Sequence, residues 1–212
     1  MNNAAQNIIK LEEETPMMQQ YITIKKEHPD SILFFRMGDF YEMFNEDAKV
    51  ASRVLEIALT SRNKNKTNPT PMCGIPHHSS KSYIAKLIKS GKKVAICEQT
   101  EDPKLTKGLV KREVVRVVTP GTILDDNLLD PKQNHFLISL HSNTKGWGFA
   151  ALDITTGLFK VTEFHGDNRE SILQDEIEKF DPKEIIISET LVDEFNKPKW
   201  LENRGSSLQP CE

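Results

Sequence analysis

The first regular pattern along the chain is helical. Thr15-Pro16 has the form of an N-cap followed by proline at the first helical position, and the pattern ends at His28-Pro29. Between them, the inward positions recur at helical spacing: Met17, Met18, Tyr21 and Ile22, with Lys25 as a further candidate. We therefore predict an amphipathic helix that ends at His28.

A continuous apolar run from Ser31 to Met37 follows, and it has no helical period, which is typical of a buried strand. Gly38-Asp39 then turns the chain, and Phe40 to Phe44 connects this strand to a helix that starts at Asn45 or Glu46. The inward face of that helix is predicted to hold Ala48, Val50 or Ala51, Val54, Leu55 and Ala58. A strand is expected near its end, over Ala58 to Ser61.

The segment from Arg62 to Thr70 is polar and basic without a period, which predicts an exposed contact loop. Ser79 or Ser80 then caps a helix, and Gly91 follows its last turn as a C′ residue. The buried face of this helix is predicted to be Tyr83, Ile84, Leu87 and Ile88. Two strands complete a mixed α/β unit: Lys92 to Gln99 and Glu113 to Val118.

Residues 119–133 contain two prolines, a glycine and three aspartates, which favours a linker between two domains. Three strands joined by short turns follow, and a helix, a strand and the start of another helix come after them. Their ranges are His135–His141, Trp147–Ile154, Leu158–Phe164, Arg169–Phe180, Glu184–Ser188 and Leu191–Phe195. This order is that of a ribonuclease-H-like sheet, and because residues 197–212 show no period, we expect the sheet to be incomplete.

The predicted organisation is thus a disordered tail (1–14), an N-terminal mixed-sheet α/β domain (15–118), a linker (119–133) and a partial ribonuclease-H-like α/β domain (134–212). Hydrophobic residues make up 37% of the chain and charged residues 28%, as in ordinary globular proteins. The start of the chain lacks a signal peptide pattern, and no apolar run is long enough to span a membrane. Three cysteines at wide spacing fit free thiols, so we expect a cytoplasmic protein.

The net charge of −3 conceals an asymmetry between the two halves of the chain. Residues 1–120 hold 19 basic and 14 acidic side chains, whereas residues 121–212 hold 9 and 17. Residues 60–116 alone carry 13 basic and 4 acidic side chains. We call this segment the basic band; it suits a polyanion such as nucleic acid, and a solvated lysine-rich surface is the alternative.

The most unusual local feature is the aromatic segment Phe40 to Phe44, which follows a strand and a flexible glycine. If Phe40 is exposed beside the basic band, its ring can enter a weakly stacked base step. Glu42 lies two residues on, hence on the same side of an extended segment, and its carboxyl group can accept from or donate to a base. The alternatives are that all the rings are core and that Glu42 is a helix-start acid.

Four segments together resemble the N-terminal part of the MutS DNA mismatch-repair proteins: Gly38–Glu42, Met72–His78, Val94–Gln99 and Arg116–Thr122. Their order and spacing match, and the resemblance runs from about Thr15 through Ala151–Ile154, with weaker support beyond. It implies a fragment that holds the mismatch-binding domain and part of the connector domain of a bacterial member of this family.

The resemblance also implies residue roles in DNA mismatch recognition. Phe40 corresponds to the phenylalanine that stacks on the mispaired base in kinked duplex DNA, Glu42 to the glutamate that hydrogen-bonds to it, and Tyr41 points inward. Arg62 resembles a contact to the DNA backbone, whereas Lys64, Lys66 and Lys81 are candidates from charge alone.

Partners and cofactors are likewise implied by the resemblance. The fragment itself is expected to be non-enzymatic and to need no cofactor or metal, because the ATPase domain, with its ATP and Mg²⁺, lies elsewhere in the family and no phosphate-binding loop motif occurs here. The full-length protein is expected to be a homodimer in the cytoplasm, associated with the nucleoid, and to engage a downstream repair-signalling protein.

Three other functions compete. A metal-dependent nuclease would use Asp153 at a strand end with further carboxylates, but the nearby acids fall on solvated faces: Glu163, Glu176, Glu178 and Asp181. A zinc site would need Cys73, His77, His78 and Cys97, which lack paired-ligand spacing. A protein-interaction module is the third, suggested by the acidic second half.

Overall fold

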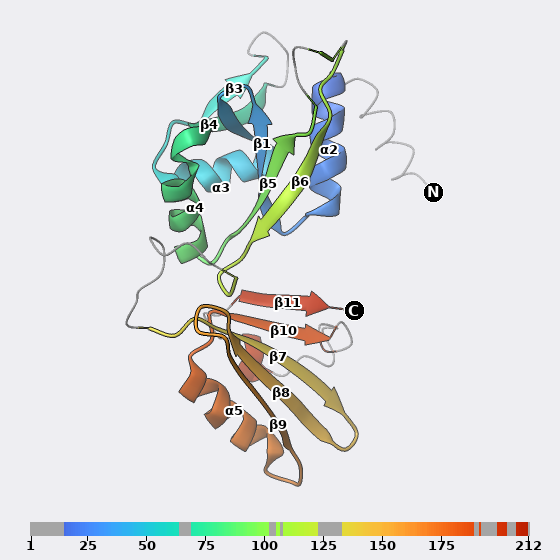
Figure 1. The fold of residues 1–212 in the computed structure, drawn as a ribbon, viewed down its shortest axis with the longest axis vertical. Coiled ribbons are helices and arrows are strands. Elements are labelled where there is room, and N and C mark those ends of the chain that lie inside the picture. The colour runs from blue at the N-terminus through green and yellow to red at the C-terminus, as the bar shows by residue number, and fades with distance from the viewer. Residues whose placement is uncertain are drawn as a thin grey trace. The chain divides into compact units, whose positions relative to one another are not determined.

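The computed structural model describes residues 15–63, 69–101, 105–106, 108–122, 133–188, 191, 199–202 and 207–211 (Figure 1). The chain divides into two compact units, residues 1–118 and 119–212. This division falls at the start of the segment in which the charge balance changes sign. The expected tail, residues 1–14, lies outside the described residues.

Unit 1 is built on a six-stranded mixed sheet of order β3-β4-β2-β1-β5-β6, which confirms the predicted fold class. Strand β1 pairs in parallel with β5, and every other neighbouring pair is antiparallel. The strands are β1 (Ser31–Met37), β2 (Phe40–Phe44), β3 (Thr60–Arg62), β4 (Thr70–Pro76), β5 (Lys93–Gln99) and β6 (Arg112–Val118). The helices are α2 (Pro16–Glu27), α3 (Asn45–Leu55), α4 (Ser80–Lys89) and the 3₁₀ turn η1 (His77–Ser79).

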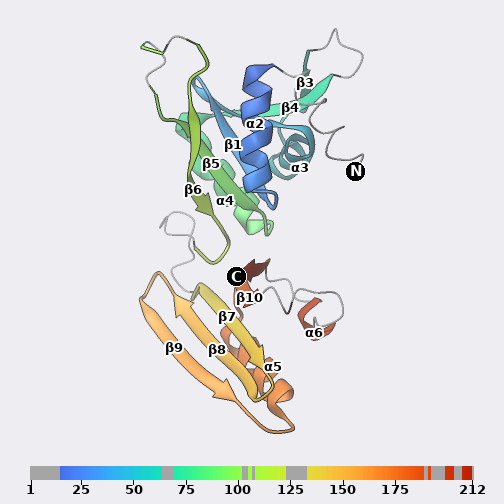
Figure 2. The ribbon, with the colours of Figure 1, turned by 90° about the vertical axis from the view of Figure 1, so that its right-hand side faces the viewer.

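Helices cover both faces of this sheet, with α2 on one face and α3 and α4 on the other (Figure 2). The first five residues of β1 are all buried because helices cover the strand on both faces, as its continuous apolar sequence predicted. The core beneath α2 comprises Met17, Met18, Tyr21, Ile24, Leu33, Phe35, Phe44, Ala95 and Cys97. Ile24 is buried in α2 where the pattern had favoured Ile22, which packs at the margin of this core.

Several boundaries in unit 1 follow the sequence signals closely. The backbone N–H of Met18 donates to the Oγ1 of Thr15 (3.4 Å), as expected for an N-cap, and Gly91 has a positive φ after α4. Strand β4 was not predicted: its first residue, Thr70, was assigned to the exposed loop, and Pro71 to Pro76 were assigned to no element. Pro71, Gly74 and Pro76 give it a poor strand sequence, and pairing with β2 and β3 on its two sides determines its conformation.

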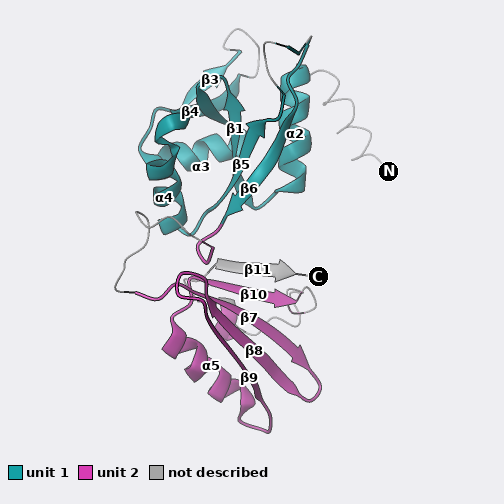
Figure 3. Cartoon of the chain, viewed as in Figure 1, with its two compact units in different colours: residues 1–118 teal, residues 119–212 magenta. Residues whose placement is uncertain are grey.

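Unit 2 has a five-stranded sheet of order β11-β10-β7-β8-β9, the order of a ribonuclease-H-like sheet. Figure 3 shows its strands β7 to β10 in magenta. Strands β7, β8 and β9 form an antiparallel meander. Strand β10 pairs in parallel with β7, and β11 pairs in parallel with β10. The elements are β7 (Phe136–Asn143), β8 (Gly146–Asp153), β9 (Leu158–Phe164), α5 (Arg169–Phe180), β10 (Glu184–Ser188), α6 (Lys199–Glu202) and β11 (Ser207–Cys211).

The sheet was expected to be incomplete because residues 197–212 show no period, yet α6 and the sheet strand β11 lie there. Strand β11 owes its conformation to parallel pairing with β10, a long-range contact that leaves no period in the sequence. Most of the helix expected over Leu191–Phe195 falls outside the described residues. No helix in the described ranges is both long and apolar enough to cross a membrane.

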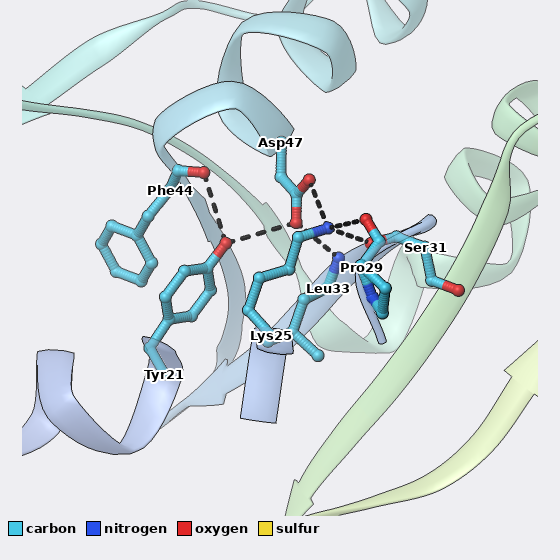
Figure 4. A network of polar contacts seen from close by, with 7 residues as sticks. All are labelled: Tyr21, Lys25, Pro29, Ser31, Leu33, Phe44 and Asp47. Carbon is cyan, nitrogen blue, oxygen red and sulfur yellow. Dashed lines mark hydrogen bonds and ion pairs between the residues drawn. The ribbon is translucent and has the colours of Figure 1, made fainter. Parts of the chain in front are cut away.

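A buried carboxylate joins three elements of unit 1 (Figure 4). Asp47 in α3 accepts hydrogen bonds from the backbone N–H of Leu33 (3.0 Å), the hydroxyl of Tyr21 (3.3 Å) and the ammonium of Lys25 (2.9 Å). Burial, and then the charge of Asp47, raise the pKa of Tyr21. The hydroxyl of Tyr21 also lies 3.3 Å from the carbonyl oxygen of Phe44, so the network fixes the inner end of β2 to helix α2.

Candidate nucleic-acid interface

Strand β2 runs from the surface of unit 1 into its core. Gly38, with φ of +57°, occupies the left-handed region in the turn between β1 and β2, a conformation that costs glycine little. Phe40 is then 48% exposed, whereas Phe44 at the other end of the strand is fully buried. Because side chains alternate along a strand, Phe40, Glu42 and Phe44 share one face. Phe40 is thus presented to solvent next to Glu42.

Tyr41 lies on the opposite face and is buried, at 4% exposure. Its hydroxyl is hydrogen-bonded to the carboxylate of Glu98 in β5, and the guanidinium of Arg36 lies 5.6 Å from the centre of its ring. Arg36 also forms an ion pair with Glu98 (3.7 Å). Burial, followed by the bond to Glu98, raises the pKa of Tyr41 to about 12, so the phenol remains a donor near neutral pH. These contacts hold β2 with Phe40 turned outward.

Glu42 is paired with Arg62 across the intervening strand β4. Nη1 of Arg62 lies 3.2 Å from Oε2 of Glu42, and the side chains are 36% and 20% exposed. The guanidinium of Arg62 also lies 6.0 Å from the centre of the Phe44 ring. Burial raises the pKa of Glu42, and the charges of Arg62 and Arg112 oppose this shift without cancelling it. Glu42 is therefore a carboxyl group that gains a proton more readily than an exposed glutamate.

Arg112 belongs to the basic band by sequence, but it is only 7% exposed. It donates to the carbonyl oxygens of Arg36 (2.7 Å) and Val110 (2.9 Å) and to Oε1 of Gln20 (3.0 Å). Lys93 is buried as well, at 8% exposure. Both cations are thus withdrawn from the surface that the basic band was expected to offer, and Arg112 acts as a fixed positive charge in the electrostatic environment of Glu42.

Two of the residues predicted to contact a phosphate backbone, Arg62 and Lys81, lie in the described part of the chain. Arg62 is next to Glu42, and Lys81 is exposed in the first turn of α4, the helix that follows β4 and η1. Lys64 and Lys66 lie outside the described residues. The pairing of Arg62 with Glu42 is not apparent from the sequence, because it depends on β4 bringing β3 and β2 into one sheet.

Asp153, the acid on which the nuclease alternative depends, has a structural role. It is fully buried, and its Oδ1 accepts from the backbone N–H (3.0 Å) and the hydroxyl (2.6 Å) of Thr155. Burial would raise the pKa of Asp153, but hydrogen bonds from Thr155 and Thr156 outweigh it and lower the pKa. Asp153 therefore fixes the turn between β8 and β9.

The zinc alternative fails on geometry. Cys97 belongs to the core beneath α2, whereas the thiol of Cys73 donates to the carbonyl oxygen of Ala48 in α3, on the other face of the sheet. Two thiols on opposite faces of a sheet do not bind one ion. Within the part of the chain that the structure describes, no three His, Cys, Asp or Glu side chains are grouped to hold a metal.

Comparisons with known proteins cover both units. Residues 15–127 match the family model described as MutS domain I, and residues 135–209 match MutS domain II. The DNA mismatch repair protein MutS of Desulforamulus reducens is 54% identical over 178 residues, which are 84% of this chain and 20% of that protein.

Two further relatives carry the same name and the same 54% identity. The match to the Acetivibrio thermocellus protein covers 90% of this chain and 22% of that protein. The match to a Staphylococcus aureus protein covers 86% of this chain and 21% of that protein. The chain thus spans about a fifth of the length of these curated relatives.

Proposed function

Because the chain belongs to the MutS family, we propose that it tests duplex DNA for mispaired or unpaired bases in DNA mismatch repair. Phe40 is the ring that stacks on the mispaired base, and Glu42 is the group that hydrogen-bonds to it. The main support is the position of Phe40, which is 48% exposed and shares a sheet face with Glu42.

The selectivity of an inserted ring depends on the difference between two free energies of similar size. Stacking of one base on an aromatic side chain contributes about 1–3 kcal/mol, and unstacking a base step costs a similar amount. At a correctly paired step, the free energy gained by stacking on the ring and the free energy lost by unstacking nearly cancel. A mispaired step is already weakly stacked and easily kinked, so insertion of Phe40 becomes favourable there.

Glu42 supplies a second level of discrimination. When ionised it accepts from a base N–H, and when protonated it donates to a ring nitrogen. Its pKa is already raised by burial, and nearby phosphates would raise it further. Perfectly paired DNA offers no unstacked base to form this hydrogen bond, so the phosphates repel the charge of Glu42 without compensation.

Contacts to phosphates position the duplex without reading its sequence. Arg62, Lys64, Lys66 and Lys81 are the proposed contacts. If Arg62 turns to a phosphate, Glu42 loses this ion pair, which favours the protonated form of Glu42 in the complex.

For the whole protein we propose the remaining family properties: a cytoplasmic, nucleoid-associated homodimer that hydrolyses ATP with Mg²⁺ in another domain and engages a repair-signalling protein.

The proposal is tested by fluorescence anisotropy of the full-length protein on paired and mispaired duplexes, wild type against Phe40→Ala. We expect the variant to lose its preference for the mispaired duplex and to retain weak, salt-sensitive binding, because its phosphate contacts remain. Phe159→Ala, which removes an exposed ring from unit 2, is the control and should preserve the preference. Equal losses of affinity on both duplexes for Phe40→Ala would refute the role of this ring.

A further inference from the structure

Gly74 lies in the middle of β4, directly opposite Glu42 in the antiparallel pair of β4 with β2. It is exposed, whereas its neighbours Cys73 and Ile75 are buried on the other face of the sheet. Gly74 therefore belongs to the face that carries Phe40 and Glu42.

A side chain at Gly74 would stand between these two residues. A Cβ atom built there lies 3.7 Å from Cγ of Glu42 and 4.0 Å from Cδ1 of Phe40. Its nearest neighbour is the carbonyl oxygen of Tyr41, at 3.4 Å. Any larger side chain would fill the space that separates the ring from the carboxylate.

Among the described residues of unit 1, no contact requires glycine at this position. Gly74 does not have a positive φ, so an L-residue can adopt its backbone without strain. The contacts of the added Cβ are ordinary van der Waals distances, so alanine also fits. Glycine weakens a strand interior, and it often marks a site where another molecule approaches closely.

We propose that Gly74 is a specificity-determining residue: its missing side chain keeps open the space between Phe40 and Glu42, which receives the edge of an unstacked nucleobase. This inference rests on the proposed function of Phe40 and Glu42. The base stacks on the ring of Phe40, and its hydrogen-bonding edge passes over the backbone of Gly74 to reach the carboxyl group of Glu42. A side chain at this position lifts the base away from Glu42 and leaves the phosphate contacts intact.

The test uses the full-length protein with Gly74→Ala and Gly74→Val, and fluorescence anisotropy on paired and G·T-mispaired duplexes. We expect Gly74→Val to lower the ratio of mispaired to paired affinity about fivefold or more, the effect of losing one hydrogen bond between the base and Glu42. Gly74→Ala should lower it less, and paired-DNA affinity should stay unchanged in both variants. Since valine favours strands, thermal stability should not fall.

Gly148 provides the matched control. It is a strand glycine in β8, and a Cβ added there meets only the carbonyl oxygen and Cβ of His141, at 3.8 and 4.0 Å. Gly148→Ala should therefore leave the affinity ratio unchanged. In a Glu42→Ala background Gly74→Val should have a smaller effect than in the wild type, a coupling that a purely structural role of Gly74 would not produce.

The outcomes separate the inference from the proposed function. If the wild type prefers the mispaired duplex and Phe40→Ala abolishes this preference, but both Gly74 variants keep it, the role of Gly74 is wrong and the proposed function stands. If the wild type shows no preference, both fail. If Gly74→Val unfolds, the affinity ratio of Gly74→Ala alone tests the role of Gly74, because its added methyl group fits the folded strand.

Discussion

Arg62 neutralises Glu42 from the far side of strand β4, with Nη1 of the arginine 3.2 Å from Oε2 of the glutamate. The two residues are 20 positions apart in the sequence and come from strands that do not pair with each other. The carboxyl group proposed to meet a base is thus held, in the free protein, by a cation that is itself proposed to meet a phosphate. The ion pair of Arg62 with Glu42 therefore competes with both proposed contacts to DNA.

Removal of Arg62 should raise the pKa of Glu42 further. Burial raises this pKa and Arg62 is the first of the charges that oppose it, so Arg62→Met leaves Arg112 as the opposing charge among the described residues. The measurement is an NMR titration of the Glu42 carboxyl carbon in both proteins. Arg116→Met, at an exposed position in β6, is the control and should leave the titration unchanged. A Glu42 pKa that stays constant or falls in Arg62→Met would contradict the role of the pair.

Glu42→Ala should bind paired DNA more tightly than the wild type and discriminate less. The charge of Glu42 is repelled by paired DNA without a compensating hydrogen bond, so its removal should increase paired-DNA affinity several-fold at low salt and less at high salt. Paired-DNA affinity is measured by anisotropy at two ionic strengths. Glu42→Gln, which removes the charge but keeps a hydrogen-bonding group, should show the same gain on paired DNA and retain more discrimination. Unchanged affinity of Glu42→Ala for paired DNA would refute the repulsion.

Tyr41→Phe should lower the free energy of unfolding by about 1 kcal/mol near neutral pH, because it removes the hydrogen bond to Glu98. The pKa of Tyr41 is about 12 when folded, above its ordinary value of 10.0, so the folded chain retains a proton that the unfolded chain loses. This stabilisation is complete below pH 10 and disappears as pH rises to 12. Urea unfolding at pH 8 and at higher pH should therefore show a steeper loss of stability for wild type than for Tyr41→Phe.

Tyr83→Phe in α4 is the matched control, since it removes a tyrosine hydroxyl from another element and leaves the bond between Tyr41 and Glu98 in place. If Tyr41→Phe and wild type lose stability with the same slope between pH 10 and 12, the bond to Glu98 does not hold the strand.

Local signals in the sequence predicted much of the fold. Helix α2, strand β1, helix α5 and strand β10 lie where caps, periodicity and apolar runs placed them, because those signals act within a few residues. Strands β4 and β11 were missed, since their conformation depends on partners distant in sequence.

The candidate site was only partly predictable for the same reason. The alternation of side chains along a strand places Phe40 and Glu42 on one face. It does not tell whether that face is covered, because this depends on where α2 packs. Their roles came from the resemblance to a family, not from the pattern. Gly74 and the Glu42–Arg62 pair required the register of β4 with its two neighbours. The burial of Arg112 is likewise a tertiary effect, which no count of basic residues reveals.

Asp47→Ala should destabilise unit 1 strongly. It leaves the ammonium of Lys25, the hydroxyl of Tyr21 and the backbone N–H of Leu33 without their shared acceptor (Figure 4). Loss of one member of a buried ion pair costs about 3–5 kcal/mol, and we expect the lower part of this range because Lys25 also donates to two backbone carbonyls. Glu46→Ala is the matched control: this neighbouring acid is exposed and pairs only with Lys49 among its described contacts, so its removal should change stability by less than about 0.5 kcal/mol. Urea unfolding followed by circular dichroism measures both, and equal effects of the two substitutions would show that the network does not tie β2 to α2.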